Sequence, residues 1–334
     1  MEKTKVGVIG LGSIAQLVHL PNLVKLSNSE ITSVSEIDKR KLNAIADKFS
    51  IPNRYSDYKE LIDKSDIDAV IITTPTSLHA EIAIYALNSG KHVLVEKPFV
   101  RSFQEGIPVI EAAKKANKHV IVGMNLRHRP DAMLLKSVIS SEEIGKIFYI
   151  KGGWIRRKSS EQDWFMKKEE SGGGVIIDIG IVLLDLALWL LDYPKVEAIS
   201  CQNFYQNTKN IEDSSISFLR CNNSRLVSLE TSWSLPMEKA SHYFTVYGTN
   251  GYATLNPFSV FKKYEDQYIE VGSSQTENSA ILFQKSYLNE LKNFIGAIRG
   301  INPLVSTGEE ALERLRIVEA MYRSSAEHKE ITLS

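Results

Sequence analysis

A glycine-rich stretch close to the N-terminus has the spacing of a phosphate-binding turn. In the run VGVIGLGSIA, the pattern GxGxxA follows an apolar segment and begins a helical one. Gly10 permits a tight turn, Gly12 lets the backbone approach a pyrophosphate, and Ala15 allows a helix to pack closely on a strand. The amides of Ser13 and Ile14 belong to the helix N-terminus that would face the anion. A tight turn without a ligand is the alternative, but the position after the first strand favours dinucleotide binding.

An acidic residue stands where the second strand is expected to end. A carboxylate at Glu36 accepts hydrogen bonds from both ribose hydroxyls of a dinucleotide and repels a 2′-phosphate. The cofactor expected from this residue is therefore NAD rather than NADP. Lys39, Arg40 and Lys41 follow closely and carry positive charge that would soften this preference. The alternative is that these three cations are a solvated helix start.

Two further polar stretches follow strands of the same pattern. One holds Thr74, Pro75 and His79, and the other is VEKP, which contains Glu96 and Lys97. Open α/β sheets bind ligands at the edge where parallel strands end, so we expect these five residues at the cofactor site. A partly buried lysine beside a nicotinamide can serve in proton transfer. A surface lysine paired with Glu96 is the alternative.

The elements that must position these residues alternate in type over residues 1–123. Short β-branched runs alternate with helical patterns, and the strands are almost continuously apolar, which predicts a parallel sheet covered on both faces. Right-handed crossovers make this a doubly wound domain. The expected strands are Lys5–Ile9, Glu30–Ser35, Asp68–Thr73, His92–Glu96 and His119–Gly123, and the expected helices are Ser13–Leu26, Asp38–Phe49, Ser77–Asn88 and Ser102–Ala116.

In residues 124–334 strands and helices no longer alternate regularly, and this part is predicted to form a second, α/β domain. Successive strands with hairpin turns, Asn-Gly being the sharper turn signal, indicate a largely antiparallel sheet. The C-terminal helix is expected to pack back near the first domain. The expected elements are helices at 131–140, 175–191, 281–299 and 308–327, strands at 146–155, 196–206, 213–220, 225–234 and 241–248, and a mobile loop at 271–280.

The composition is that of an ordinary globular protein. Of 334 residues, 43% are apolar and 24% are charged, and 40 Lys and Arg balance 40 Asp and Glu. A neutral chain lacks the basic surplus that nucleic acids and anionic membranes attract, so we expect neither as a partner. Cys201 and Cys221, without a Cys/His cluster, predict no metal site and a reducing, cytoplasmic compartment. The apolar run 175–191 is short for a bilayer and contains Asp178 and Asp185, so we interpret it as a buried helix.

Taken together, these motifs resemble the Gfo/Idh/MocA oxidoreductases, the relatives of glucose–fructose oxidoreductase and inositol dehydrogenase. The resemblance implies a Rossmann domain followed by an α/β domain whose open sheet forms homodimers or homotetramers. It implies NAD(P)-dependent oxidation of a sugar or cyclitol hydroxyl, or the reverse reduction. The segments that carry it are Gly10–Ala15, Thr74–His79, Glu96–Pro98, Gly123–Arg127, Gly172–Asp185 and Leu291–Val305.

Residue by residue, the resemblance makes Lys97 the catalytic lysine of the family's EKP motif. Asp178 begins the DxGxH pattern, and Gly180 is its glycine. The histidine of that pattern falls on position 182, which is Val182 in this chain. Positions four apart share one face of a helix, so both would face the substrate. That face therefore presents a carboxylate beside an isopropyl group, with no imidazole to move the proton.

Further residues are expected near the substrate. Asn125 and Arg127 lie in the segment GMNLR, and we expect both to contact a hydroxylated substrate. Trp154 would form an apolar wall of the pocket; the alternative is an ordinary core aromatic.

Three interpretations of Val182 remain open. Lys97 handles the proton alone, with Asp178 orienting the substrate or the lysine. Alternatively, another group such as His128 or Tyr149 replaces the histidine. In the third interpretation, hydride chemistry has been lost and the protein is a dinucleotide-binding regulator or scaffold. A reductase of a non-sugar carbonyl, with a more apolar pocket, is a further alternative.

Overall fold

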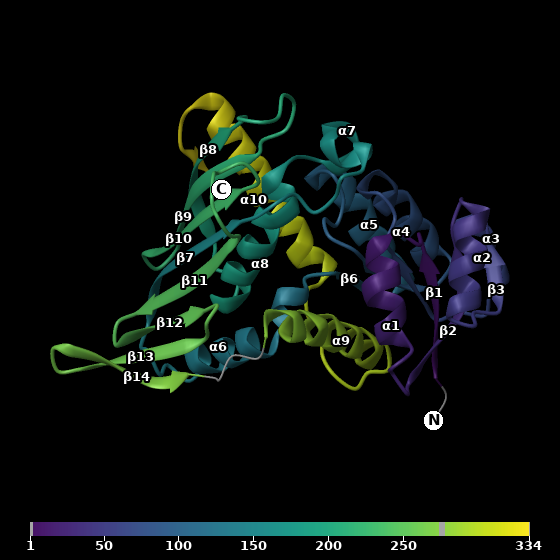
Figure 1. The fold of residues 1–334 in the computed structure, drawn as a ribbon, viewed down its shortest axis with the longest axis horizontal. Helices are drawn as coiled ribbons and strands as arrows, with labels where there is room; N and C mark the ends of the chain where they lie inside the picture. The colour runs from purple at the N-terminus through teal and green to yellow at the C-terminus, as the bar shows by residue number, and fades with distance from the viewer. Residues whose placement is uncertain (1–2, 274–277, 334) are drawn as a thin grey trace. The chain divides into compact units, whose positions relative to one another are not determined.

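The computed structural model describes residues 3–273 and 278–333. The chain divides into two compact units (Figure 1). Unit 1 contains residues 1–125 and 284–313, and unit 2 contains residues 126–283 and 314–334. The expected loop at 271–280 is shorter than predicted, because β14 runs to Ser273 and α9 begins at Ser279. The rest of that prediction, residues 274–277, lies outside the described residues.

Unit 1 is built on a parallel sheet of six strands, which confirms the predicted doubly wound fold. The strand order is β3-β2-β1-β4-β5-β6, so the order reverses between β1 and β4, where open α/β sheets bind ligands. Inner strands such as β4 are buried at every residue because helices cover both faces. The strands are β1 Thr4–Ile9, β2 Ser29–Ser35, β3 Asn53–Tyr55, β4 Ala69–Ile72, β5 His92–Val95 and β6 Val120–Val122.

The helices of unit 1 begin at recognisable caps. Asp38 accepts hydrogen bonds from the first amides of α2, and Ser102 accepts one at α5. Leu291, Phe294 and Ile295 of α9 join the buried cluster formed by β1 and β4. The helices are α1 Leu20–Leu23, α2 Lys39–Lys48, α3 Tyr58–Lys64, α4 His79–Asn88, α5 Phe103–Ala116, α9 Ser279–Ile298 and the start of α10 Gly308–Glu327.

Two details of unit 1 differ from the sequence prediction. The pair β3 and α3 was not expected, because β3 has three residues, two of them exposed, and so lacks an apolar run. The predicted helix 13–26 is divided: Ala15–His19 forms a π-helix, and α1 follows with a proline in its first turn. Since π-turns occur frequently at functional sites, this irregularity directly after the glycine turn is informative.

Unit 2 contains a sheet of nine strands in the order β14-β13-β12-β11-β7-β10-β9-β8-β15. Neighbours pair antiparallel except β7 with β10, so the predicted, largely antiparallel sheet is confirmed. Asn223 and Ser224, both with positive φ, turn β9 into β10. The strands are β7 Ile147–Ile155, β8 Val196–Phe204, β9 Ser214–Cys221, β10 Arg225–Ser232, β11 Ser241–Gly248, β12 Gly251–Leu255, β13 Ser259–Tyr264, β14 Gln267–Ser273 and β15 Ile331–Thr332.

Helices of unit 2 lie against one face of this sheet (Figure 1). The unit contains α6 Pro130–Ser140, α7 Lys168–Ser171, α8 Ile181–Leu190 and most of α10. Helix α8 contacts β7 and β10. The stretch Lys168–Leu190 is long and apolar enough to cross a membrane, but 94% of its most apolar window is buried inside the structure. The interpretation as a buried core helix is confirmed.

Candidate active site

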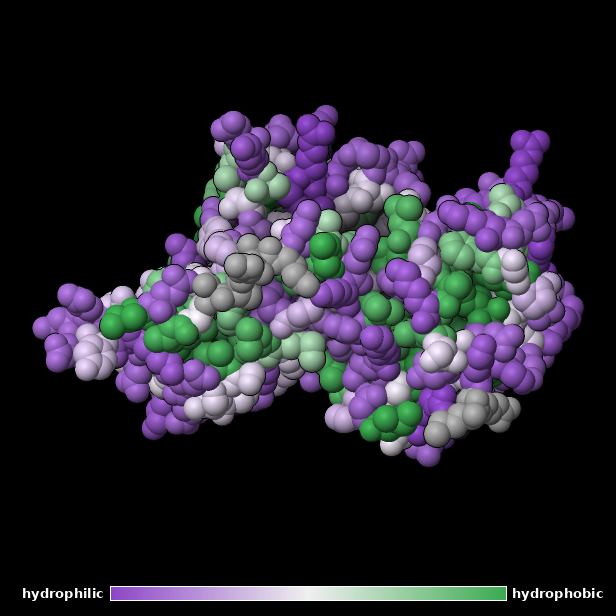
Figure 2. Space-filling model, turned by 60° about the horizontal axis from the view of Figure 1, so that its bottom comes forward, coloured by the Kyte–Doolittle hydropathy of each residue, from purple (hydrophilic) through white to green (hydrophobic). Residues whose placement is uncertain are grey.

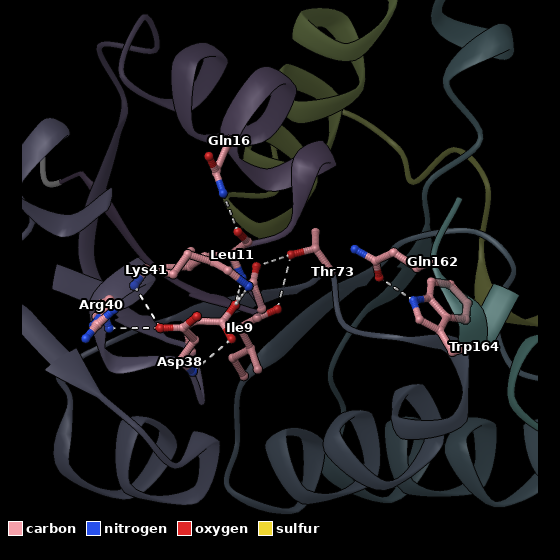
Figure 3. A network of polar contacts seen from close by, with 11 residues as sticks. Ile9, Leu11, Gln16, Asp38, Arg40, Lys41, Thr73, Gln162 and Trp164 are labelled. Carbon is pink, nitrogen blue, oxygen red and sulfur yellow. Dashed lines mark hydrogen bonds and ion pairs between the residues drawn. The ribbon is translucent and has the colours of Figure 1, made fainter. Parts of the chain in front are cut away.

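The turn after β1 has the geometry that the glycine motif predicts. Gly10 has φ of +87°, and a Cβ there would meet the carbonyl carbon and oxygen of Thr73 at 3.0 Å. Thr73 holds the two loops together, because its hydroxyl donates to the carbonyl oxygens of Gly10 at 2.5 Å and Ile9 at 3.2 Å (Figure 3). A Cβ at Gly12 would have nothing within 4 Å, so open space adjoins the backbone there. The turn therefore leaves room for a group to approach its amides.

The helix after the turn packs as the motif requires. Ala15 is fully buried and begins the π-helix, whereas Ser13 is exposed and Ile14 is half-buried. The side-chain amide of Gln16 donates to the carbonyl of Leu11 at 2.6 Å, which fixes the turn from its helical side (Figure 3).

Glu36 follows β2 directly and reaches the same turn. Its Oε2 accepts the amide of Leu11 at 3.0 Å, and its Oε1 accepts the amide of Asp38 at 3.2 Å. Lys41 of α2 lies 3.3 Å from Oε2, so this cation acts on Glu36 and is not simply a solvated residue. The carboxylate is thus held at the glycine turn, where a ribose-binding acid belongs.

His79 joins the loops that follow β4 and β5. It is 1% exposed, and its Nδ1 lies 2.9 Å from the carbonyl oxygen of Pro98 while its Nε2 lies 2.9 Å from that of Thr74. Burial lowers the pKa of His79, and the carbonyl contacts act in the opposite direction. Both ring nitrogens thus face main-chain carbonyl oxygens. His79 therefore joins the loop at Thr74 to the loop at Pro98. A direct contact with cofactor stays a prediction.

Glu96 and Lys97 follow β5, and the peptide bond from Lys97 to Pro98 is cis. The Glu96 carboxylate is buried: its Oε1 lies 2.6 Å from Nε2 of His19, and its Oε2 accepts the amide of Lys97 at 3.0 Å. Burial alone would raise the pKa of Glu96, but the hydrogen bond and charge of His19, with Lys97, outweigh it and lower that pKa. Glu96 therefore holds the main chain of Lys97, whose side chain is half-buried.

Asp178 lies in unit 2, in the π-helix Ile176–Gly180 that precedes α8, and it is 2% exposed. Its Oδ1 accepts a short hydrogen bond from the hydroxyl of Ser159. Its Oδ2 accepts the amide of Ser159 at 3.2 Å and the indole N–H of Trp233 at 3.1 Å, and Arg156 lies 3.8 Å away. Val182, one turn later, is buried in α8. Residues that follow β7 and β10 therefore hold this carboxylate.

The start of this helix is held by a buried carboxylate from outside it. Glu212 accepts the amides of Gly174 and Ile176, each at 3.0 Å, and the hydroxyl of Tyr322 at 2.9 Å. Burial raises the pKa of Glu212. A Cβ at position 174 would stand 2.0 Å from the carbonyl oxygen of Glu212, so this position requires glycine. These contacts set where Asp178 stands.

Asn125 and Arg127 are separated by the unit boundary. Asn125 donates to the hydroxyl of Ser286 at 2.9 Å within unit 1. Arg127 is 1% exposed and binds both oxygens of Asp185, at 2.8 and 2.6 Å, while Arg314 binds Asp185 at 2.6 Å. In this structure Arg127 serves a buried ion cluster, and its contact with substrate stays a prediction.

The aromatic residue Trp154 stands near the end of β7 and is half-buried. Its ring stacks on His242 with centroids 4.3 Å apart, and the Arg156 guanidinium lies 5.0 Å from the Trp154 centroid. Burial, with Arg129 and Arg156, lowers the pKa of His242 to about 3, so this imidazole is neutral near pH 7.

The two proposed substitutes for the missing histidine occupy different surroundings. His128 is buried, and burial together with Arg127 lowers its pKa to about 4. Tyr149 alternates with the buried Ile150 along β7, so it lies on the face of the sheet away from the buried core, where it bonds Ser228 at 2.7 Å.

No sequence motif contains Ser159, Trp233 or Glu212, and none assigns a role to His19. Ser159 lies in a polar stretch without periodicity, and Trp233 follows a strand as many core aromatics do. The position of His19 could have indicated a role, because it lies on the helix that starts at the glycine turn. Among the described residues, no group of three or more His, Cys, Asp or Glu is arranged to hold a metal ion.

Comparison with known proteins decides the family. Residues 4–124 match the family described as "Oxidoreductase family, NAD-binding Rossmann fold", and residues 136–333 match its "C-terminal alpha/beta domain". The chain belongs to the Gfo/Idh/MocA oxidoreductase family. The resemblance inferred from the motifs is confirmed, and the two matches cover both units of this oxidoreductase.

Relatives span the full chain at low identity. A D-glucoside 3-dehydrogenase of Escherichia coli is 24% identical over 96% of this chain and 95% of its own length. The scyllo-inositol 2-dehydrogenase (NADP(+)) of Bacillus subtilis is 25% identical over 100% of this chain and 97% of its own length. Among solved structures, a levoglucosan dehydrogenase in complex with NADH matches with a TM-score of 0.89 and 22% identity, covering 100% of both chains. That likeness shows the fold.

Proposed function

We propose that this member of the family is an NAD-dependent dehydrogenase or reductase acting on a CH–OH group of a sugar, cyclitol or related polyhydroxylated substrate. The observation that carries the proposal is the meeting of three strand ends in unit 1: the glycine turn after β1, Thr74 after β4 and Lys97 after β5. Relatives named as sugar and inositol dehydrogenases support the substrate class.

The residues present fit a dinucleotide. Gly12 has open space where a side chain would stand, and the hydroxyl of Thr74 is buried without a hydrogen-bond partner among the described residues. We propose that the backbone from Gly10 to Ala15 holds the pyrophosphate and that Glu36 holds the ribose hydroxyls. When bound, the nicotinamide accepts or donates the hydride. The close ion pair of Lys41 with Glu36 supports only a moderate preference for NAD over NADP.

In this mechanism Lys97 takes the hydroxyl proton during oxidation or returns it during reduction. Asp178 orients the substrate as a hydrogen-bond acceptor, because Ser159 and Trp233 already fix its carboxylate. This is the first interpretation of Val182, with no second proton-transfer group. It is supported by the surroundings of the two substitutes, because burial lowers the pKa of His128 to about 4 and the hydroxyl of Tyr149 is hydrogen-bonded to Ser228.

A substrate panel tests the proposal. Purified protein is incubated with NAD⁺ or NADP⁺ and a set of aldoses, glycosides and inositols, and formation of reduced cofactor is followed by absorbance. In a second series, NADH or NADPH is incubated with sugar ketones and with carbonyl compounds that lack neighbouring hydroxyls, and loss of reduced cofactor is followed. We expect turnover of at least one polyhydroxylated compound and tighter binding of NADH than NADPH. In Glu36→Gln, with the charge removed and the shape kept, the NADH preference should fall. Tight NADH binding without turnover of any panel member would support the regulator; turnover only of carbonyls lacking neighbouring hydroxyls would support the non-sugar reductase.

We also propose that the protein is a homodimer or homotetramer formed through the open face of the sheet in unit 2. Ile216 and Phe218 on β9 are 41% and 47% exposed. A series of neighbouring aromatic rings from Tyr149 through Tyr247 and Tyr252 to Phe261 crosses the same face. On that face Tyr268 of β14 meets Tyr252 edge-on and is 57% exposed. Other exposed apolar residues gather over the β13–β14 hairpin (Figure 2), but Ile269 among them pairs with Lys262 and lies on the opposite face of the sheet. Sedimentation should give a multimer that Phe218→Asp dissociates; a monomeric wild type would contradict this.

A reducing, cytoplasmic location is part of the same proposal, and the two free thiols Cys201 and Cys221 are compatible with it.

A further inference from the structure

His19 is a fully buried histidine at the end of the π-helix that follows the glycine turn. Its ring Nε2 lies 2.6 Å from Oε1 of Glu96, the residue that directly follows β5. The ring of Tyr287 meets it edge-on, with centroids 6.0 Å apart and an interplanar angle of 86°. A residue on the cofactor-binding helix is thus joined directly to the residue before Lys97.

The contacts around His19 show which ring nitrogen serves Glu96. The Glu96 carboxylate can only accept, so Nε2 must carry the hydrogen. Nδ1 is buried and has no hydrogen-bond partner among the described residues. Nε2 is therefore the ring atom that holds Glu96, and Nδ1 takes no part in that contact.

The Glu96 carboxylate links His19 to the main chain of Lys97. Its second oxygen, Oε2, accepts the main-chain amide of Lys97 at 3.0 Å. One carboxylate therefore has His19 on one oxygen and Lys97 on the other. Removing His19 would leave Oε1 of a buried carboxylate without this donor, and the group would reorient or bind a proton.

We propose that His19 is a positioning residue for Lys97. It fixes the Glu96 carboxylate, which holds the Lys97 main chain in place and keeps a negative charge beside the ammonium group. The inference rests on the proposed function in so far as Lys97 transfers the proton. Other charged or titratable groups that act on Glu96 are Lys97 itself and His79, which holds the carbonyl of Pro98 on the other side of the lysine.

The kinetic test compares two variants of similar volume. His19→Gln keeps a neutral N–H donor for Glu96, and His19→Leu does not. With the best substrate from the panel, we expect kcat to fall on the order of tenfold or more in H19L, with NADH affinity unchanged, and to recover largely in H19Q. Equal losses in both variants, or a loss confined to KM or NADH binding, would overturn the positioning role.

A second readout needs no substrate. The protein is labelled with acetic anhydride across a pH series, and the modification of Lys97 is measured by peptide mass spectrometry. Loss of the fixed Glu96 charge should move the labelling profile of Lys97 to lower pH in H19L and in Glu96→Gln, with no further shift in the double variant. If the pH profile of Lys97 labelling in E96Q equals that of the wild type, the inference is contradicted even when H19L fails to fold. A shifted profile in a protein that turns over no substrate supports the inference while the proposed function fails.

Discussion

The substitution Asp185→Asn removes the charge that two buried arginines share. Arg127 binds Asp185 through two hydrogen bonds, and Arg314 lies 2.6 Å from the same carboxylate. All three side chains are at most 1% exposed. Their net charge is +1, from two guanidinium groups and one carboxylate, and it becomes +2 in the variant.

The expected magnitude follows from that burial. Removing one partner of a buried ion pair costs about 3–5 kcal/mol, because the remaining charge stays desolvated without compensation. An amide offers one acceptor oxygen to a site built entirely of donors. Burial alone would raise the pKa of Asp185, but Arg127 and Arg314 outweigh it and lower that pKa. The stability difference should therefore be complete above the unfolded-state pKa of about 3.9 and be lost progressively as pH falls from there through the lower folded-state pKa.

The assay follows from the positions of the tryptophans. All four, at 154, 164, 189 and 233, lie in unit 2 with the ion cluster, so tryptophan fluorescence in urea reports the unfolding of that unit. Asp192→Asn is the matched control: it breaks a 2.6 Å ion pair with Lys136, but the Asp192 side chain is 82% exposed, so about 0–1 kcal/mol is expected. A loss in D185N no larger than in D192N would refute the reasoning.

Two more substitutions test how Asp178 is held. In Gly174→Ala a Cβ would stand 2.0 Å from the Glu212 carbonyl oxygen, so we expect a large loss of unit 2 stability in the same urea assay, whereas Gly180→Ala, whose Cβ would meet nothing closer than 3.6 Å, should cost far less. Equal losses of stability in the two variants would show that the backbone near Gly174 shifts to make room for the Cβ, and would contradict the requirement for glycine there. Trp233→Phe removes the indole donor to Asp178 and should lower kcat on the order of tenfold without changing NADH affinity; an unchanged kcat would remove Trp233 from the site.

Much of unit 1 could be predicted because its signals are local. The turn at Gly10 needs a positive φ, and the glycine that permits it stands in a motif of a few consecutive residues. Buried parallel strands such as β4 are continuous apolar runs. The short edge strand β3 carries no such run, and the π-turn at Ala15–His19 has no sequence period of its own, so both escaped prediction.

The site in unit 2 was harder to predict because its contacts join residues far apart in the chain. Asp178 and Val182 could be placed on one helix, but the donors to Asp178 come from 19 and 55 residues away. Arg127 was expected near the substrate because of its motif, whereas its partner Asp185 is 58 residues distant. Periodicity describes which face of an element is buried and does not say which side chains meet across that face.

The central claim is that Lys97 transfers the proton. The most direct measurement is the rate of NADH formation in Lys97→Met, whose side chain keeps the length of lysine without its amine, in parallel with NADH binding by fluorescence. The account predicts that kcat falls by at least about 10²-fold while the Kd for NADH stays within about twofold of wild type. A Lys97→Met enzyme that oxidises substrate at the wild-type rate would contradict it.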